Sequence, residues 1–170
     1  MRRLLAGRLN EAGYRRLLIR QRELFREWEA ERADWLAGVE AVTGWRYVSR
    51  EDALGRDLDA RGSAVDAAPL AAISTHAAPT RPGAPWGELY VIEGSALGGR
   101  VIVRQLREQF PHLAHHFYAI GEHATPPWHR FQSILDHALA DDAARKAAVD
   151  AALAMFARFQ QTLQDDSRHV

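Results

Sequence analysis

The sequence predicts a single all-α domain over residues 1–170. Bulky apolar residues recur at three- and four-residue steps along most of the chain, which is the spacing of one helix face. No stretch alternates apolar and polar residues between turn signals, as a half-buried strand would. With 170 residues, the chain is long enough for one well-buried core and short for two.

Composition and charge exclude several classes of function. The formal net charge is zero, whereas nucleic-acid binding needs a basic excess. No apolar run reaches the roughly 18–20 residues that span a bilayer, and the start MRRLLAGRLNEAGY is not a secretory signal. The chain has no cysteine, which fits a reducing compartment. We therefore expect a soluble, cytoplasmic protein with no nucleic-acid or membrane partner.

The first predicted helix covers residues 10–37. Asn10 is a residue type that caps helix starts, and Gly44 lies in the break that follows. Charged residues fill much of the remaining surface, so the helix is amphipathic. Its apolar residues are Tyr14, Leu17, Leu18, Leu24, Phe25, Trp28, Trp35 and Leu36.

A capping pattern opens the second predicted helix. Ser49 followed by Asp52 resembles a capping box, and Gly62 ends the short helix after it. The next segment, 75–87, reads THAAPTRPGAPWG and predicts a loop because it holds three prolines and two glycines. It leads into a long helix that ends near Phe110.

Two more helices complete the prediction. The connector 121–127 ends in two prolines, which favour the first turn of a helix reaching about Ala140. Either Asp141 or Asp142 then caps a last helix, and the tail 165–170 is expected to fray. The bulky apolar residues of the last helix are Leu153, Met155, Phe156, Phe159 and Leu163.

The stretch 89–103, LYVIEGSALGGRVIV, is the most informative part of the chain. Each interior glycine costs a helix roughly 1 kcal/mol relative to alanine. Gly94, Gly98 and Gly99 therefore indicate a close approach to that backbone, or a bend. A second helix packing on small residues and a flat ligand lying against the backbone both account for this spacing.

Titratable residues give weaker signals. Segment 112–129 holds five histidines without a metal-ligand motif, so we predict no dedicated metal site. Within it, His112 and His116 have the spacing of one helix face. Glu93 lies in an apolar stretch and needs a cationic partner if buried, for which Arg100 and Arg104 are in helical range.

Three blocks of the chain resemble blocks of one protein family, and they occur in the order in which that family has them. LYVIEGSALGGRVI, residues 89–102, resembles the distal-helix signature of the haem oxygenases, in particular the bacterial, biliverdin-producing branch often paired with phytochromes. Residues 2–29 resemble the second helix of that family, and FYAIGEHATPPWHRF, residues 117–131, resembles the block after the distal helix. The resemblance implies a multihelical bundle with a glycine-kinked distal helix. It also implies oxidative cleavage of haem b, as substrate and cofactor, to biliverdin, carbon monoxide and ferrous iron.

The resemblance implies roles for individual residues. Gly94, Ser95, Gly98 and Gly99 would contact haem from the distal side, with Ser95, Gly98 and Gly99 serving catalysis. Ser95 stands where many members carry an aspartate that anchors proton-delivering water, and a hydroxyl holds water without that charge.

The resemblance extends to the haem edge and to partners. His129 or Arg130 would meet a propionate in a charge-assisted contact, and Phe156 would line the pocket. Electrons would come from an external reductase, either ferredoxin or NADPH-dependent. A phytochrome is a candidate acceptor of the biliverdin.

The family's proximal histidine belongs to a helix that precedes the match at Arg2, and no histidine precedes His76. Three explanations stay open: a start set too late, a shortened paralogue, or iron ligation by another histidine such as His76 or one in 112–129. Geometry disfavours the last, because the preceding helix forms the opposite wall of the pocket. The alternative function is a non-catalytic module that binds haem, a bilin or a partner. A third is a helical scaffold without a tetrapyrrole.

Overall fold

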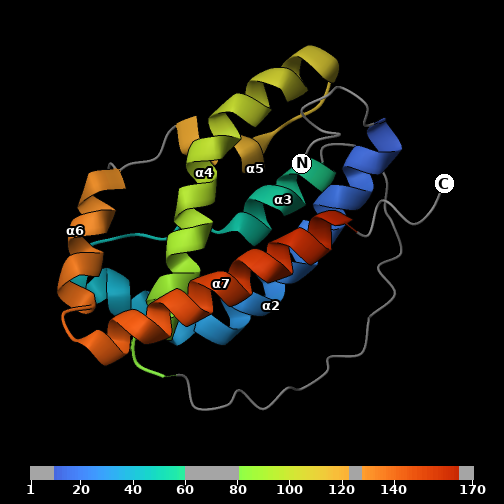
Figure 1. Ribbon diagram of the computed structural model, residues 1–170. Coiled ribbons are helices and arrows are strands. Elements are labelled where there is room, and N and C mark those ends of the chain that lie inside the picture. Colours follow the sequence, from blue (N-terminus) through green and yellow to red (C-terminus); the bar gives the residue numbers. More distant parts are fainter. Residues whose placement is uncertain (1–9, 60–80, 123–127, 165–170) are drawn as a thin grey trace.

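The computed structural model describes residues 10–59, 81–122 and 128–164, and within these ranges it contains helices and no strand (Figure 1). The all-α prediction is confirmed. The elements are α2 (Glu11–Thr43), α3 (Arg50–Asp59), α4 (Ala84–Gln109), α5 (His116–Ala119), the 3-10 turn η1 (Ile120–Glu122), α6 (Trp128–Ala138) and α7 (Asp142–Gln164).

The first predicted helix is α2, which begins at the expected cap but runs to Thr43, beyond the predicted end at residue 37. The Asn10 side chain accepts a hydrogen bond from the Gly13 amide at 2.8 Å. Gly44 adopts a left-handed conformation with φ of 66°, and its amide donates to the Glu40 carbonyl. This conformation favours glycine because a β-carbon is strained there. Local sequence therefore sets both ends of α2.

Side-chain caps also begin α3 and α7. The Asp52 amide donates to the Ser49 hydroxyl at 3.0 Å, as the capping pattern predicts. Of the two candidates for the last helix, Asp141 is the cap, since its carboxylate accepts from the Ala144 amide at 2.8 Å. Gly62, the two prolines before Trp128 and the tail 165–170 lie outside the described residues.

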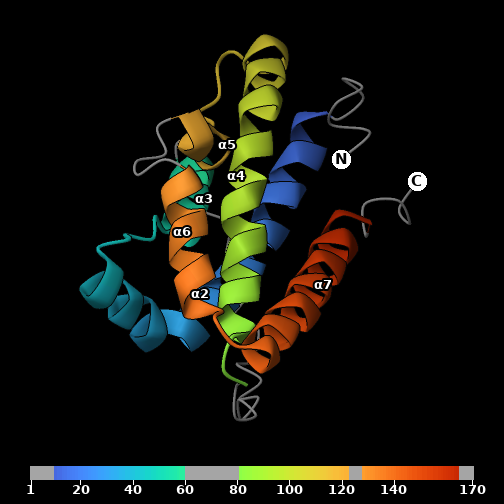
Figure 2. The same cartoon turned by 60° about the vertical axis from the view of Figure 1, so that its left-hand side comes forward.

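The core surrounds α2, which passes behind α7 in Figure 1 and behind α4 in Figure 2. Tyr14, Phe25 and Trp28 of α2 are fully buried. They pack in one cluster with Leu89 and Ile92 of α4. Burial of such large side chains supplies most of the favourable free energy of folding. None of the described helices has the length and apolar character needed to cross a membrane.

The start of α4 corrects the predicted loop 75–87, because the helix begins at Ala84. Pro85 lies in the first turn, where its missing N–H leaves no hydrogen bond unmade. Gly87 permits the close crossing of α4 over α7, since a β-carbon there would overlap the Ala148 carbonyl. From this crossing the two helices diverge (Figures 1 and 2).

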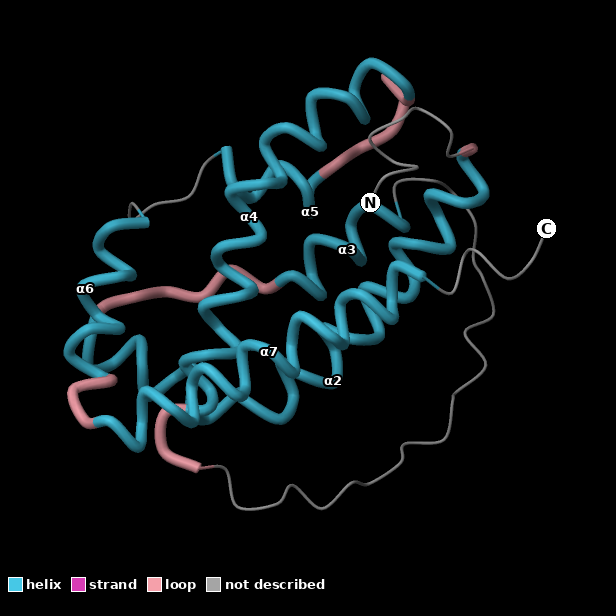
Figure 3. The backbone as a smooth tube through the Cα atoms, viewed as in Figure 1, coloured by secondary structure: helices cyan, strands magenta, loops and turns pink. Residues whose placement is uncertain are grey.

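The tube drawn in Figure 3 shows α4 changing direction about half-way along its length. This is the part of the helix that holds Gly94, Gly98 and Gly99, and the helix continues through it without interruption. Bends in helices have identifiable causes, and glycines are among them. The bend agrees with the glycine-kinked distal helix that the resemblance implies.

Candidate functional site

One side of the glycine segment packs against α5 and η1. A β-carbon on Gly99 would lie 2.8 Å from the Tyr118 carbonyl oxygen, which is too close for a real contact. A β-carbon on Gly121, in η1, would overlap the carbonyl of Ala96 in α4. Backbone therefore packs directly on backbone here, and close packing accounts for Gly99.

The other side of the segment is open. A β-carbon on Gly98 would meet no atom of the described chain within 4 Å outside its own helix. A β-carbon on Gly94 would lie 3.6 Å from the Trp128 ring, an ordinary van der Waals distance. The Ser95 side chain is exposed, and its hydroxyl donates to the Ile92 carbonyl at 2.7 Å. Packing between described helices does not explain Gly98.

Apolar side chains stay exposed on both diverging helices. On α7, Val149, Leu153 and Phe156 are 58%, 64% and 52% exposed, and their spacing of four and three residues places them on one stripe. On α4, Leu97 and Val101 are exposed close to Gly98 in sequence. An exposed apolar stripe such as the one on α7 is typical of a binding site or an interface.

The first turns of α6 lie beside α4. The Trp128 ring contacts the Tyr90 ring, with centroids 5.5 Å apart, as well as approaching Gly94. The next residue, His129, is exposed. Trp128 was not among the predicted site residues. Its position directly after two prolines, at a predicted helix start, was the sequence signal that could have indicated it.

Arg130 points toward the C-terminal end of α2. Its guanidinium donates to the Thr43 carbonyl at 3.4 Å. It also lines a largely apolar cleft of about 470 Å³ with Trp86 and His137. The residues lining this cleft include no glycine of α4.

Glu93 has a partner that its sequence neighbourhood did not indicate. The Glu93 carboxylate pairs with the Arg50 guanidinium of α3 at 3.1 Å, and the two side chains are only 11% and 3% exposed. The predicted partners are wrong: Arg100 donates to the Gly121 carbonyl, and Arg104 pairs with Glu108 on the surface. The partner is 43 positions earlier in the chain, beyond any helical spacing.

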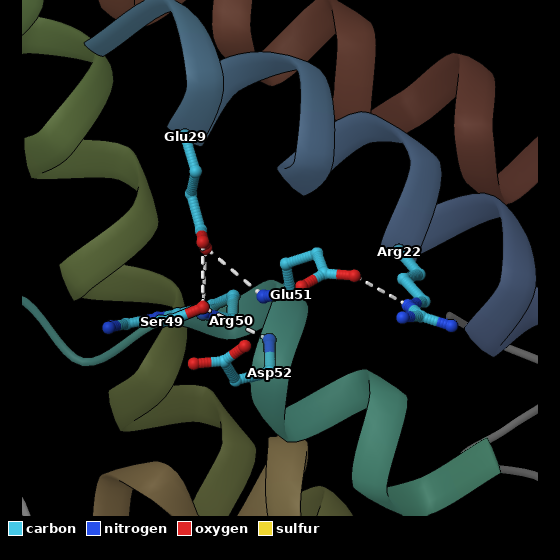
Figure 4. A network of polar contacts seen from close by, with 6 residues as sticks. All are labelled: Arg22, Glu29, Ser49, Arg50, Glu51 and Asp52. Atoms are coloured by element: carbon cyan, nitrogen blue, oxygen red, sulfur yellow. Dashed lines mark hydrogen bonds and ion pairs between the residues drawn. The ribbon is translucent and has the colours of Figure 1, made fainter. Parts of the chain in front are cut away.

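Glu29 of α2 gathers the residues that begin α3 (Figure 4). Its carboxylate accepts from the Ser49 hydroxyl at 2.7 Å and from the Arg50 amide at 2.8 Å. It also accepts from the Tyr47 hydroxyl at 2.9 Å. Burial raises the pKa of Tyr47 well above its ordinary value, which keeps that donor protonated. Glu29 therefore adds a negatively charged acceptor at the N-terminus of α3, beside the Ser49 cap.

Asp57, near the end of α3, holds α5 in place. The fully buried Asp57 carboxylate accepts from the backbone amides of His116 and Phe117 at 2.6 and 3.0 Å. Tyr118 then donates its hydroxyl to Gln21 of α2 at 3.2 Å, and burial raises the pKa of the Tyr118 phenol. These contacts fix the backbone on which Gly99 packs.

The described histidines are dispersed. Buried His115 contacts the Tyr14 hydroxyl through Nδ1 at 3.0 Å and the Phe110 carbonyl through Nε2 at 3.2 Å. His112 lies in the turn before α5 and meets Glu11, whereas His116 begins α5, so the expected shared face is wrong. No three His, Asp or Glu side chains in the described ranges gather as metal ligands. His76 and His123 lie outside those ranges.

Comparisons with known proteins identify the family of the chain. A family model described as "Heme oxygenase" matches residues 1–165. The chain belongs to the haem oxygenase family. The curated protein "Heme oxygenase" from Xanthomonas campestris pv. campestris (strain 8004) is 40% identical over 170 residues, which are 99% of each chain. No solved structure matches the chain.

Family membership makes haem the expected ligand, and the described residues fit its macrocycle. A β-carbon on Gly98 would meet no described atom within 4 Å outside its own helix, so the backbone there is open to a ligand. Exposed apolar side chains such as Val101 and Phe156 suit a flat apolar ring. Both ring nitrogens of His115 have protein partners, so that histidine is not presented to iron.

Proposed function

We propose that this chain binds haem b against the open side of α4 and cleaves it oxidatively to biliverdin, carbon monoxide and ferrous iron. The observation that carries the proposal is Gly98, a helix-interior glycine with no described neighbour. The described chain gives no packing reason for its helical cost of roughly 1 kcal/mol, and a macrocycle lying on bare backbone in the family's distal-helix block would supply one. Bound haem supplies the iron at which oxygen is reduced.

The residues of α4 divide the work. Gly94 and Gly98 let the macrocycle lie close to the helix, and the exposed Ser95 hydroxyl holds water near the reacting edge. We assign Gly99 an indirect part in catalysis, through the packing on Tyr118 that keeps the open side in place.

The edge of the haem is assigned to α6 and α7. His129 or Arg130 meets a propionate, and neither side chain pairs with a carboxylate among the described residues. Phe156 lines the apolar side of the pocket, in keeping with its exposure on α7.

Electrons are supplied by an external reductase, either a ferredoxin or an NADPH-dependent flavoprotein. A phytochrome is the proposed acceptor of biliverdin. Both assignments follow from the likeness to the bacterial biliverdin-producing branch, and they specify the partners that the activity requires.

The second candidate function is haem or bilin binding without turnover. It is favoured by His115, the one buried histidine in the described ranges, because that side chain is engaged by Tyr14 and Phe110. It is favoured also by Ser95, which places a hydroxyl rather than a carboxylate on the open side.

Titration of the purified chain with haemin, followed by addition of a reductase and NADPH, separates these functions. The proposal predicts a Soret band of ligated haem that gives way to biliverdin absorbance. A stable Soret band without biliverdin would favour the second candidate, and no haem uptake would reject both.

A pair of variants tests the location. Gly98→Leu places a large side chain on the open side and should weaken haem binding at least about tenfold. Gly38→Leu is the matched control, because Gly38 is also an exposed helical glycine with no described neighbour within 4 Å, but it lies in α2. Equal haem affinity in the two variants would reject this site.

A further inference from the structure

The glycine segment of α4 is held at each end by another part of the chain. At its start, Glu93 pairs with Arg50 of α3 at 3.1 Å. At its end, Gly99 packs on the Tyr118 carbonyl, and Arg100 donates to the Gly121 carbonyl. Between these two anchors, a β-carbon on Gly98 would meet no atom of the described chain within 4 Å outside its own helix.

Arg50 is itself fixed before it meets Glu93. Its amide donates to Glu29, and its Nη1 donates to the Val48 carbonyl at 2.6 Å. The guanidinium carbon lies 4.8 Å from the centre of the Tyr47 ring, a cation–π contact. Figure 4 shows Arg50 at the start of α3 below the Glu29 carboxylate. The Arg50 guanidinium is therefore a rigidly held cation that extends from the start of α3 to α4.

Water cannot readily take the place of either partner in this ion pair. The Arg50 Nη2 atom is buried and makes no hydrogen bond besides its ion pair with Glu93. Removing one member of a buried pair leaves the other charge uncompensated, which is strongly unfavourable. The pair therefore defines one position of the Glu93 turn relative to α3.

The adjoining turn depends on such an anchor. Three glycines within six residues lower the intrinsic stability of this part of α4. Local opening of a helix is easiest where buried contacts are few, and Gly94, Ser95 and Gly98 have few of them. A contact immediately before Gly94 limits that opening.

We propose that Glu93 and Arg50 are positioning residues, whose buried ion pair fixes the turn that carries Gly94 and Ser95 and so shapes the open side of α4. Both side chains are almost fully buried, so their effect on the ligand site is assigned to the position of the backbone. The link to haem rests on the proposed function above, whereas the ordering of the turn does not.

Hydrogen exchange of the full chain without haem tests the ordering. Glu93→Gln should speed exchange of the amides of residues 94–98 about tenfold or more relative to wild type. Amides at the centre of α2, residues 17–25, should keep their rates. Glu108→Gln is the matched control, since Glu108 pairs with Arg104 on the same helix but at the surface. Unchanged exchange at 94–98, or an equal increase in α2, would overturn the proposal.

The haem-loaded protein gives a second readout. Glu93→Gln should change the affinity of ferric haem for azide by several-fold, because the turn bordering the ligand site moves, while Glu108→Gln should leave it unchanged. A purely stabilising role would lower the melting temperature without changing azide affinity, and that result would overturn the link to haem. If wild type takes up no haem, the proposed function fails, whereas the exchange experiment still decides the ordering.

Glu93→Asp keeps the experiment decisive if Glu93→Gln does not fold. It retains the charge but withdraws the carboxylate by one methylene. Exchange at 94–98 should be faster than in wild type, and slower than in Glu93→Gln where that variant folds. Wild-type exchange rates and wild-type azide affinity in Glu93→Asp would overturn the proposal.

Discussion

Glycines in and around α4 fall into two groups that differ in what a β-carbon would meet. In the packed glycines, Gly87, Gly99 and Gly121, it would run into the backbone of another element. In the open glycines, Gly94 and Gly98, it would meet an aromatic ring at an ordinary distance or nothing in the described chain. The packed glycines are explained by the fold itself. The described packing gives no reason for the open glycines, and haem, the ligand of the family, is the occupant proposed for that side.

The largest effect is expected at the packed glycines with the closest neighbours. Gly87→Ala or Gly121→Ala forces a methyl group into a backbone carbonyl, of Ala148 or Ala96 respectively. Backbone cannot yield as a flexible side chain does, so each variant should lose about 3 kcal/mol or more of unfolding free energy. Urea denaturation measures this. Wild-type stability in either variant would remove the distinction between the two groups.

A smaller loss is expected for Gly99→Ala. Its methyl carbon would lie 2.8 Å from the Tyr118 carbonyl oxygen, so a shift of a few tenths of an ångström relieves the contact. The gain in helix propensity offsets part of the strain, which leaves a net loss of about 1 kcal/mol. Thermal unfolding of this variant beside Gly87→Ala checks the order. A stabilised Gly99→Ala would place Gly99 with the open glycines.

The packed side should also be dry, and Tyr118 reports on that. Burial raises the pKa of its phenol, so the folded state favours the neutral form. The stabilisation is fully present below the unfolded pKa near 10 and is lost as pH rises above it. Absorbance of tyrosinate at 295 nm should therefore show Tyr118 ionising together with loss of helical circular dichroism. A tyrosinate absorbance step that occurs while the protein is still folded, and that is missing in Tyr118→Phe, would show that Tyr118 ionises in the folded state. That result would mean that water reaches this side.

Much of the fold follows from local sequence. Asn10 and Gly44 set the two ends of α2 through contacts within one turn, and Asp141 does the same for the start of α7. Such contacts depend on neighbouring residues and can be predicted. The start of α4 could not, because the prolines and glycines of 82–87 suit a loop equally well until α7 packs on Gly87.

Features that depend on tertiary contact could not be predicted. The Arg50–Glu93 pair joins positions 43 apart, and a sequence alone gives no preference for it over Arg100 or Arg104. The glycine pattern indicated close approach or a ligand, and the structure divides it: Gly99 packs, whereas Gly98 is open. Spacing cannot make that division, because both positions are glycine in the same helix.

The comparison of Gly98→Ala with Gly38→Ala tests the central claim most directly. Both positions are exposed, helical and without a described neighbour within 4 Å, so both variants should gain about 0.5–1 kcal/mol of unfolding free energy. Only Gly98→Ala should bind haem more weakly than wild type, by several-fold in a haemin titration. A stabilised Gly98→Ala that binds haem as tightly as wild type and Gly38→Ala would contradict the claim that haem lies on the open side of α4.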